Sequence, residues 1–173
     1  RRYYLAYYLI DKDTNKSIRI LGRLVEDTNN PEHILMLLHA YLANHHEASN
    51  ITLIRKALSE VKQSAKEQWS DIPSYPLPWI SGVLHAYLTI NDISSMRETW
   101  KLLSSAQKFL PQLLTPYCEL LLKHKLVKEA DIAFSAYIRF LGQYEALSDE
   151  LAKINDYIMN ALAKESSEVD QEI

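Results

Sequence analysis

Apolar and polar positions along this chain repeat with a helical period from its first residues. In residues 1–13, Tyr4 and Tyr8 are four positions apart, as are Leu5 and Leu9, which places each pair on one side of a helix. The same period predicts helices at residues 17–27, 32–46, 51–69, 79–90, 93–110, 113–123, 127–143 and 148–164.

The breaks between these segments carry residues that start or end helices. Pro31 is suited to the first position of a helix, and Ser148 is suited to an N-cap ahead of an apolar stripe. The sequence SDIPSYPLP at residues 70–78 holds three prolines and is the clearest linker in the chain. The whole chain has only 3 Gly and 6 Pro, too few for the turns of a many-stranded β fold, so we predict an all-α fold.

A short motif recurs within the apolar segments. The letters HAYL stand at residues 39–42 and again at 85–88. Dipeptides that end the apolar part of a helix are separated by 33, 46 and 34 residues, and two of these separations match the period of helix–turn–helix repeats. The dipeptides are Tyr8-Leu9, Tyr41-Leu42, Tyr87-Leu88 and Leu121-Leu122, and the matching second-helix pairs are Ser17 with Leu21, Met96 with Trp100, and Ala130 with Phe134.

The best of these units, LLTPYCELLLKHKLVKEADIAFSAYI at residues 113–138, resembles the tetratricopeptide-repeat and pentatricopeptide-repeat superfamily of α-solenoids. The resemblance implies a right-handed α-solenoid of antiparallel helical hairpins, with about four hairpins and a C-terminal helix. Residues 1–165 would then form a single helical-repeat domain, with the proline linker between the second and third hairpins. The acidic residues 166–173 would form a flexible tail.

Composition and charge narrow the classes of partner. The chain has 173 residues, 19 Lys and Arg, 22 Asp and Glu, and a net charge of −3, which disfavours nucleic acid as the ligand. A single cysteine excludes an intramolecular disulfide and fits a reducing compartment. No apolar run is long enough to span a membrane. Since the first residue is Arg, we expect a segment of a larger protein, intracellular and cytoplasmic by default, with an organelle left open.

None of the reactive side chains forms a recognisable catalytic or metal-binding pattern. Four histidines, His33, His39, His45 and His46, lie close in sequence but lack the spacing of metal ligands. Cys118 stands among apolar residues and is expected to be a packing residue. No phosphate-binding glycine loop and no catalytic triad order is present. We therefore predict a protein that is not an enzyme, with no metal and no cofactor.

The tyrosines of the first helix offer three interpretations, of which stacking with nucleic-acid bases is the least favoured because only Arg1 and Arg2 stand nearby as cations. Tyr3, Tyr4, Tyr7 and Tyr8 occur within six residues, at helical spacing. Core and inter-repeat packing is the first interpretation. A partner surface is the second, because tyrosine is enriched in interfaces, and self-association through this aromatic helix is one form of it.

The resemblance also implies a concave groove lined by the first helix of each hairpin. Residues two positions before the repeated dipeptides would point into it, and so would residues at the end of the same helices. Among them Ala6 and Ile10 come from the first hairpin. The partner-binding residues that we predict are His39, Ala43, His85, Thr89, Glu119 and Lys123.

Three functions remain open from the sequence. The first is a non-catalytic helical-repeat scaffold or adaptor that binds a protein or peptide. The second is a pentatricopeptide-like RNA-binding module in RNA processing or translation. Against it, Gly82 and Pro116 stand where that family reads bases with polar side chains. The third is an enzyme or small-molecule sensor on a helical scaffold, which would need a pocket.

Overall fold

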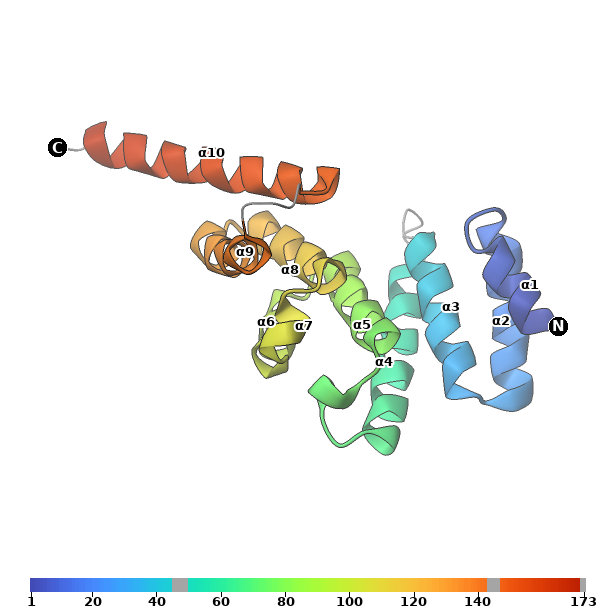
Figure 1. Cartoon of the computed structure of the whole chain (residues 1–173). Coiled ribbons are helices and arrows are strands. Elements are labelled where there is room, and N and C mark those ends of the chain that lie inside the picture. The colour runs from blue at the N-terminus through green and yellow to red at the C-terminus, as the bar shows by residue number, and fades with distance from the viewer. Residues whose placement is uncertain (45–49, 143–146, 172–173) are drawn as a thin grey trace. The chain divides into compact units, whose positions relative to one another are not determined.

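The computed structural model describes residues 1–44, 50–142 and 147–171, and all regular structure within those ranges is helical (Figure 1). The predicted all-α fold is confirmed. The helices are α1 (Arg2–Leu9), α2 (Thr14–Thr28), α3 (Pro31–Ala43), α4 (Asn50–Gln68), the 3₁₀ turn η1 (Ile72–Ser74), α5 (Leu77–Ile90), α6 (Ile93–Leu102), α7 (Ser105–Lys108), α8 (Pro111–Lys123), α9 (Val127–Leu141) and α10 (Asp149–Gln171).

The chain divides into two compact units. Unit 1 is Arg1–Asp92 and contains α1 to α5, and unit 2 is Ile93–Ile173 and contains α6 to α10. The boundary therefore lies between α5 and α6, within the third of the predicted hairpins.

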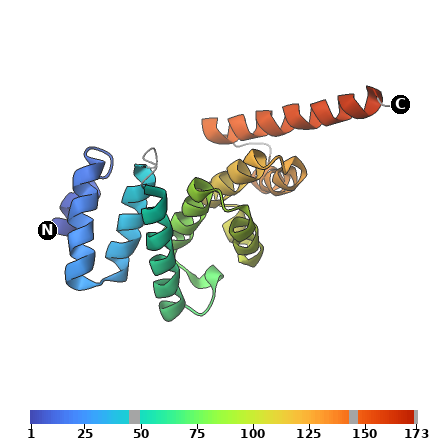
Figure 2. The ribbon, with the colours of Figure 1, turned by 180° about the vertical axis from the view of Figure 1, so that it is seen from behind.

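In unit 1, successive helices pack side by side and alternate in direction (Figures 1 and 2). α3 is the central helix, because it packs against α2, α4 and α5. The alternation follows from short connections whose polar residues cap the helices. Asp13 caps α2 by accepting a 3.1 Å hydrogen bond from the Lys16 amide, and Asn30 caps α3 ahead of Pro31, the predicted first helical residue.

The proline segment of unit 1 is anchored by aromatic packing. Trp69 at the end of α4 meets Trp79 of α5 edge to face, with ring centroids 5.1 Å apart, and its ring lies 5.7 Å from that of Tyr75. Asp71 caps the 3₁₀ turn by accepting from the Ser74 amide. The segment links α4 to α5, and Tyr75 within it contacts Trp69.

Unit 2 is organised around α8, which packs against α6, α7, α9 and α10. Trp100 of α6 stacks on Tyr117 of α8 with centroids 4.0 Å apart and ring planes 7° from parallel. All six second-helix positions that the repeat comparison aligned are buried across the two units: Ser17, Leu21, Met96, Trp100, Ala130 and Phe134.

Two helix boundaries in unit 2 differ from prediction. The single helix expected at residues 93–110 is wrong, because α6 ends at Leu102 and α7 starts at Ser105. Ser104 and Gln107 form a capping box, in which each side chain accepts from the other residue's amide. At the C-terminal end, α10 continues to Gln171, through residues expected to be a flexible tail. No Gly or Pro occurs in residues 165–171 to end the helix.

Candidate binding cleft between α8 and α10

An open cleft of about 520 Å³ lies between α8 and α10 in unit 2. Two of its apolar residues, Leu122 and Ile154, are buried and form its floor. Charged side chains of both signs and one exposed tyrosine surround this floor. The seven lining residues are Glu119, Leu122, Lys123, Glu150, Lys153, Ile154 and Tyr157.

The helical period of both elements explains why these side chains meet. Glu119, Leu122 and Lys123 are at positions i, i+3 and i+4 of α8, which form one face of a helix. The α10 residues start at Glu150 and follow the same spacing through i+7. Ser148 helps to set where α10 begins, since its hydroxyl accepts from the Leu151 amide at 3.4 Å, as expected of an N-cap.

Burial and like charge perturb one acidic residue of this cleft, Glu119. Partial burial raises the pKa of Glu119, and the negative charge of Glu150 raises it further, while Lys123 opposes the shift. The ion pairs found among the described residues are Arg2–Asp27 and Arg97–Glu129, so neither glutamate of the cleft forms one in that part of the chain.

The structure brings only two of the predicted groove residues together in this cleft. Glu119 and Lys123 line it, whereas His39, Ala43, His85 and Thr89 belong to unit 1. Of those four, only Ala43 is exposed, at the end of α3. The Thr89 hydroxyl donates to the His85 carbonyl at 2.9 Å, within α5.

His39 of α3 packs against α5 at Gly82. A Cβ atom on Gly82 of α5 would lie 3.4 Å from Cε1 and Nε2 of His39, and 3.2 Å from Cδ1 of Leu35. The absence of a side chain at Gly82 thus lets α3 and α5 approach closely. Burial lowers the pKa of His39, and a hydrogen bond with the backbone of Pro78 opposes that shift.

Ala6, also expected to face a groove, is fully buried, so that expectation is wrong. Its carbonyl accepts a 2.7 Å hydrogen bond from the buried Ser17 hydroxyl of α2. This bond joins α1 to α2 beside Ala6.

The tyrosines of α1 are the largest departure from the packing interpretation. Tyr3 is half-buried, with its ring centroid 5.3 Å from that of His33 of α3. Tyr4, Tyr7 and Tyr8 are instead exposed, so core packing is wrong for these three. They lie on the side of α1 away from Ala6 and α2.

Cys118 and His33 make contacts within the fold. Cys118 is fully buried, as predicted, and burial raises the pKa of its thiol to about 12. The Nδ1 atom of His33 lies 2.9 Å from the Thr28 hydroxyl. Within residues 1–44, 50–142 and 147–171, no three His, Cys, Asp or Glu side chains are placed to hold a metal ion. His45 and His46 lie outside the described residues.

Sequence reasoning missed the contribution of α10 to the cleft. The sequence predicts residues 148–164 only as a C-terminal helix. The sequence does contain a signal for this contribution. Glu150, Lys153 and Tyr157 stand at positions i, i+3 and i+7, beside the apolar stripe of their helix. Glu119 and Lys123 of α8 are likewise spaced to share one helical face.

Across the described part of the chain, no helix combines the length and apolar character that crossing a membrane requires. Comparison of the chain with protein-family models, with curated proteins and with solved structures finds no match.

Proposed function

We propose that this chain is a non-catalytic helical-repeat adaptor that binds a segment of a partner protein in the α8–α10 cleft. The observation that carries the proposal is the cleft itself, with a floor of Leu122 and Ile154 and a rim of two glutamates and two lysines. Such a combination suits an amphipathic segment, whose apolar residues enter the floor and whose charges meet the rim. Tyr157 would supply the aromatic contact typical of interface centres.

The hairpin packing within each unit supports an α-solenoid of paired helices as the architecture of the adaptor. α1 with α2, α3 with α4, and α8 with α9 each form a packed pair. We propose that the pairs belong to one right-handed solenoid closed by α10. An intracellular location fits the free Cys118.

RNA binding receives less support than a protein partner. Gly82 and Pro116, which stand at the expected base-reading positions, are both buried. Neither can therefore meet a base in the described structure. The net charge of −3 also supplies no electrostatic attraction to phosphates.

Selection from a displayed peptide library tests this function without a known partner. The folded chain serves as bait, and the dissociation constants of selected peptides are measured by fluorescence anisotropy. We expect Tyr157→Ala and Lys153→Glu each to weaken binding by tenfold or more, because both residues line the cleft.

The matched controls are exposed residues of the same unit outside the cleft, Lys128→Glu and Glu98→Lys. They should leave affinity within twofold of the original chain. Peptides whose binding ignores the cleft variants would contradict the proposal. Tighter binding of single-stranded RNA than of any selected peptide would favour the RNA function.

A further inference from the structure

The four charged side chains of the α8–α10 cleft are separated by sign along each helix. On α8, Lys123 lies four residues after Glu119. On α10, Lys153 lies three residues after Glu150. At about 1.5 Å per residue, each lysine is therefore roughly 4–6 Å further along its helix than the glutamate, close to one helical turn. Each wall of the cleft thus presents an acidic residue and then a basic one.

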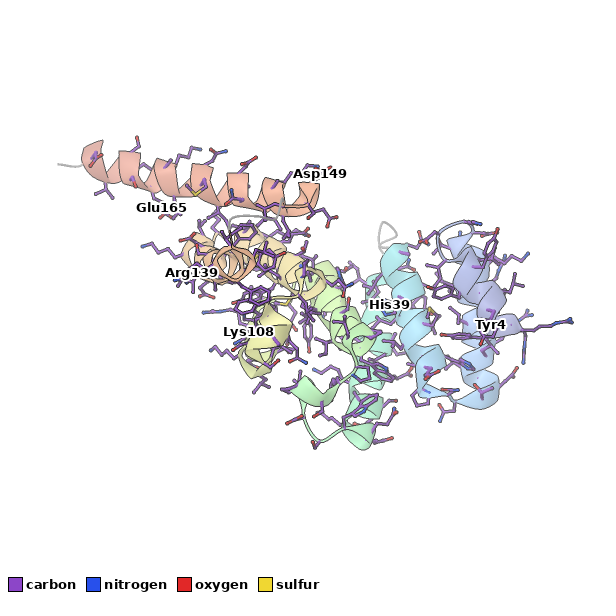
Figure 3. All side chains as sticks on the ribbon, viewed as in Figure 1. Tyr4, His39, Lys108, Arg139, Asp149 and Glu165 are labelled. Carbon is purple, nitrogen blue, oxygen red and sulfur yellow. The ribbon has the colours of Figure 1, made fainter. Side chains whose placement is uncertain are left out.

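The two walls run in the same direction. α8 and α10 point the same way in both ribbon views (Figures 1 and 2), and the label on Asp149 in Figure 3 marks the end of α10 beside Glu150. Parallel walls place the two glutamates at one end of the cleft and the two lysines at the other. We name these the acidic end, Glu119 with Glu150, and the basic end, Lys123 with Lys153.

The electrostatics of Glu119 agree with this separation. The negative charge of Glu150 raises the pKa of Glu119, so the two glutamates lie close together although they belong to different helices. Lys123 acts on that pKa in the opposite direction and less strongly than Glu150. Among the described residues, no ion pair joins a lysine of the basic end to a glutamate of the acidic end. The two ends therefore differ in the sign of their charge.

The backbone around the cleft favours a helical ligand. All regular structure in the described part of unit 2 is helical, so no strand edge in that part can pair with the backbone of an extended segment. A bound helix satisfies its own backbone hydrogen bonds and can bind through side chains alone. Its apolar stripe would cover the floor that Leu122 and Ile154 form.

We propose that the partner segment is a helix that carries one basic and one acidic residue, about one turn apart beside its apolar stripe. This pattern, which rests on the proposed function, places the basic residue at the acidic end of the cleft and the acidic residue at the basic end. A helix with two basic or two acidic residues would bring like charges together at one end. The separation of charge also fixes the direction in which the helix binds.

A displayed library of amphipathic helices tests the charge pattern. All members share one leucine stripe, and two positions one turn apart beside it vary among Lys, Glu and Ala. With the folded chain as bait, we expect members with one Lys and one Glu to be enriched at least tenfold over every other class. Equal enrichment of all classes, or preference for another class, would overturn the proposal.

Charge reversal in the chain then locates the contact. Glu119→Lys with Glu150→Lys should weaken binding of an enriched Lys–Glu peptide at least tenfold. Replacing the Lys of the peptide by Glu should restore the affinity to within about threefold. The matched control is Glu98→Lys with Glu165→Lys, which changes the net charge equally at exposed residues outside the cleft and should leave affinity within twofold. Circular dichroism verifies that both variants fold.

The variant Tyr157→Ala distinguishes failure of this pattern from failure of the proposed function. Peptides that lose affinity on Tyr157→Ala but ignore the charge reversal would overturn the charge pattern and leave the cleft as the binding site. Peptides that respond to neither change would overturn both. Equal loss of affinity in the charge-reversed chain and in its matched control would show a net-charge effect and would also overturn the pattern.

Discussion

Two helices that each begin a packed pair, α1 and α8, differ sharply in how many of their side chains are buried. Both are rich in apolar residues, and both contain tyrosine. In α8, Tyr117 and Cys118 are buried along with most of the apolar residues of the helix. In α1, only Ala6 is buried, and Tyr4 faces solvent.

The difference comes from the number of neighbours and not from the residues themselves. α8 packs against α6, α7, α9 and α10, so that its sides are covered in several directions. α1 packs mainly on α2, and Tyr3 alone reaches the ring of His33 in α3. A helix with one neighbour can bury one narrow stripe, and its remaining apolar residues stay available for a partner.

The largest expected effect compares the same substitution in both helices. Tyr117→Ala should lower the free energy of unfolding by about 3–5 kcal/mol, because a buried aromatic ring is lost and its stack on Trp100 is broken. Tyr4→Ala should change it by less than about 0.5 kcal/mol, as for other surface positions. Urea denaturation followed by circular dichroism measures both. Similar losses at the two positions would refute the comparison.

A smaller effect tests how α1 is held. Ser17→Ala removes the buried hydrogen bond to the Ala6 carbonyl, and should cost about 0.5–1.5 kcal/mol. Hydrogen exchange should then accelerate in residues 2–9 more than elsewhere in unit 1. The control is Ser166→Ala, whose hydroxyl makes an exposed bond within α10. If exchange in α1 is unchanged, contacts other than this bond hold the helix.

The smallest effect concerns α3, which like α8 has neighbours on several sides. Burial lowers the pKa of His39 below its ordinary value of 6.5, so the unfolded chain takes up this proton at a higher pH than the folded chain. The neutral His39 ring therefore makes its full contribution to the free energy of unfolding above about pH 6.5, and this contribution declines as the pH falls below that value.

In the variant His39→Phe this part of the acid dependence should disappear. The free energy of unfolding of each protein is measured at pH 7.5 and at pH 5. The change between the two pH values is then compared between the original chain and the variant. The difference in the free energy of unfolding between the original chain and the variant should become smaller, or change sign, at pH 5. A gap independent of pH would mean that His39 titrates alike in both states.

The repeat comparison in the sequence predicted the buried side of the second helices correctly, from Ser17 and Leu21 to Ala130 and Phe134. It could do so because the side that faces a partner helix repeats with the helical period, which is a local property. The break at Ser104 was also available from sequence, as a serine three residues before a glutamine.

The candidate site was predictable only in part. Glu119 and Lys123 were correctly placed on one face of α8, because their spacing alone decides that. The residues opposite them, Glu150, Lys153 and Tyr157, come from a helix about 30 positions further along the chain. No periodicity shows which face of one helix meets which face of another.

The sequence by itself determined that this chain is helical, where most of its helices begin, and which stripe of each second helix is apolar. Those properties depend on neighbours within a few residues, through hydrogen bonding, capping and the 3.6-residue period. Only the tertiary structure decided that His39 packs against Gly82, that α10 lines a cleft with α8, and that Tyr4 is exposed while Tyr117 is buried. Burial depends on which helices surround a side chain, and that is set by contacts between distant parts of the chain.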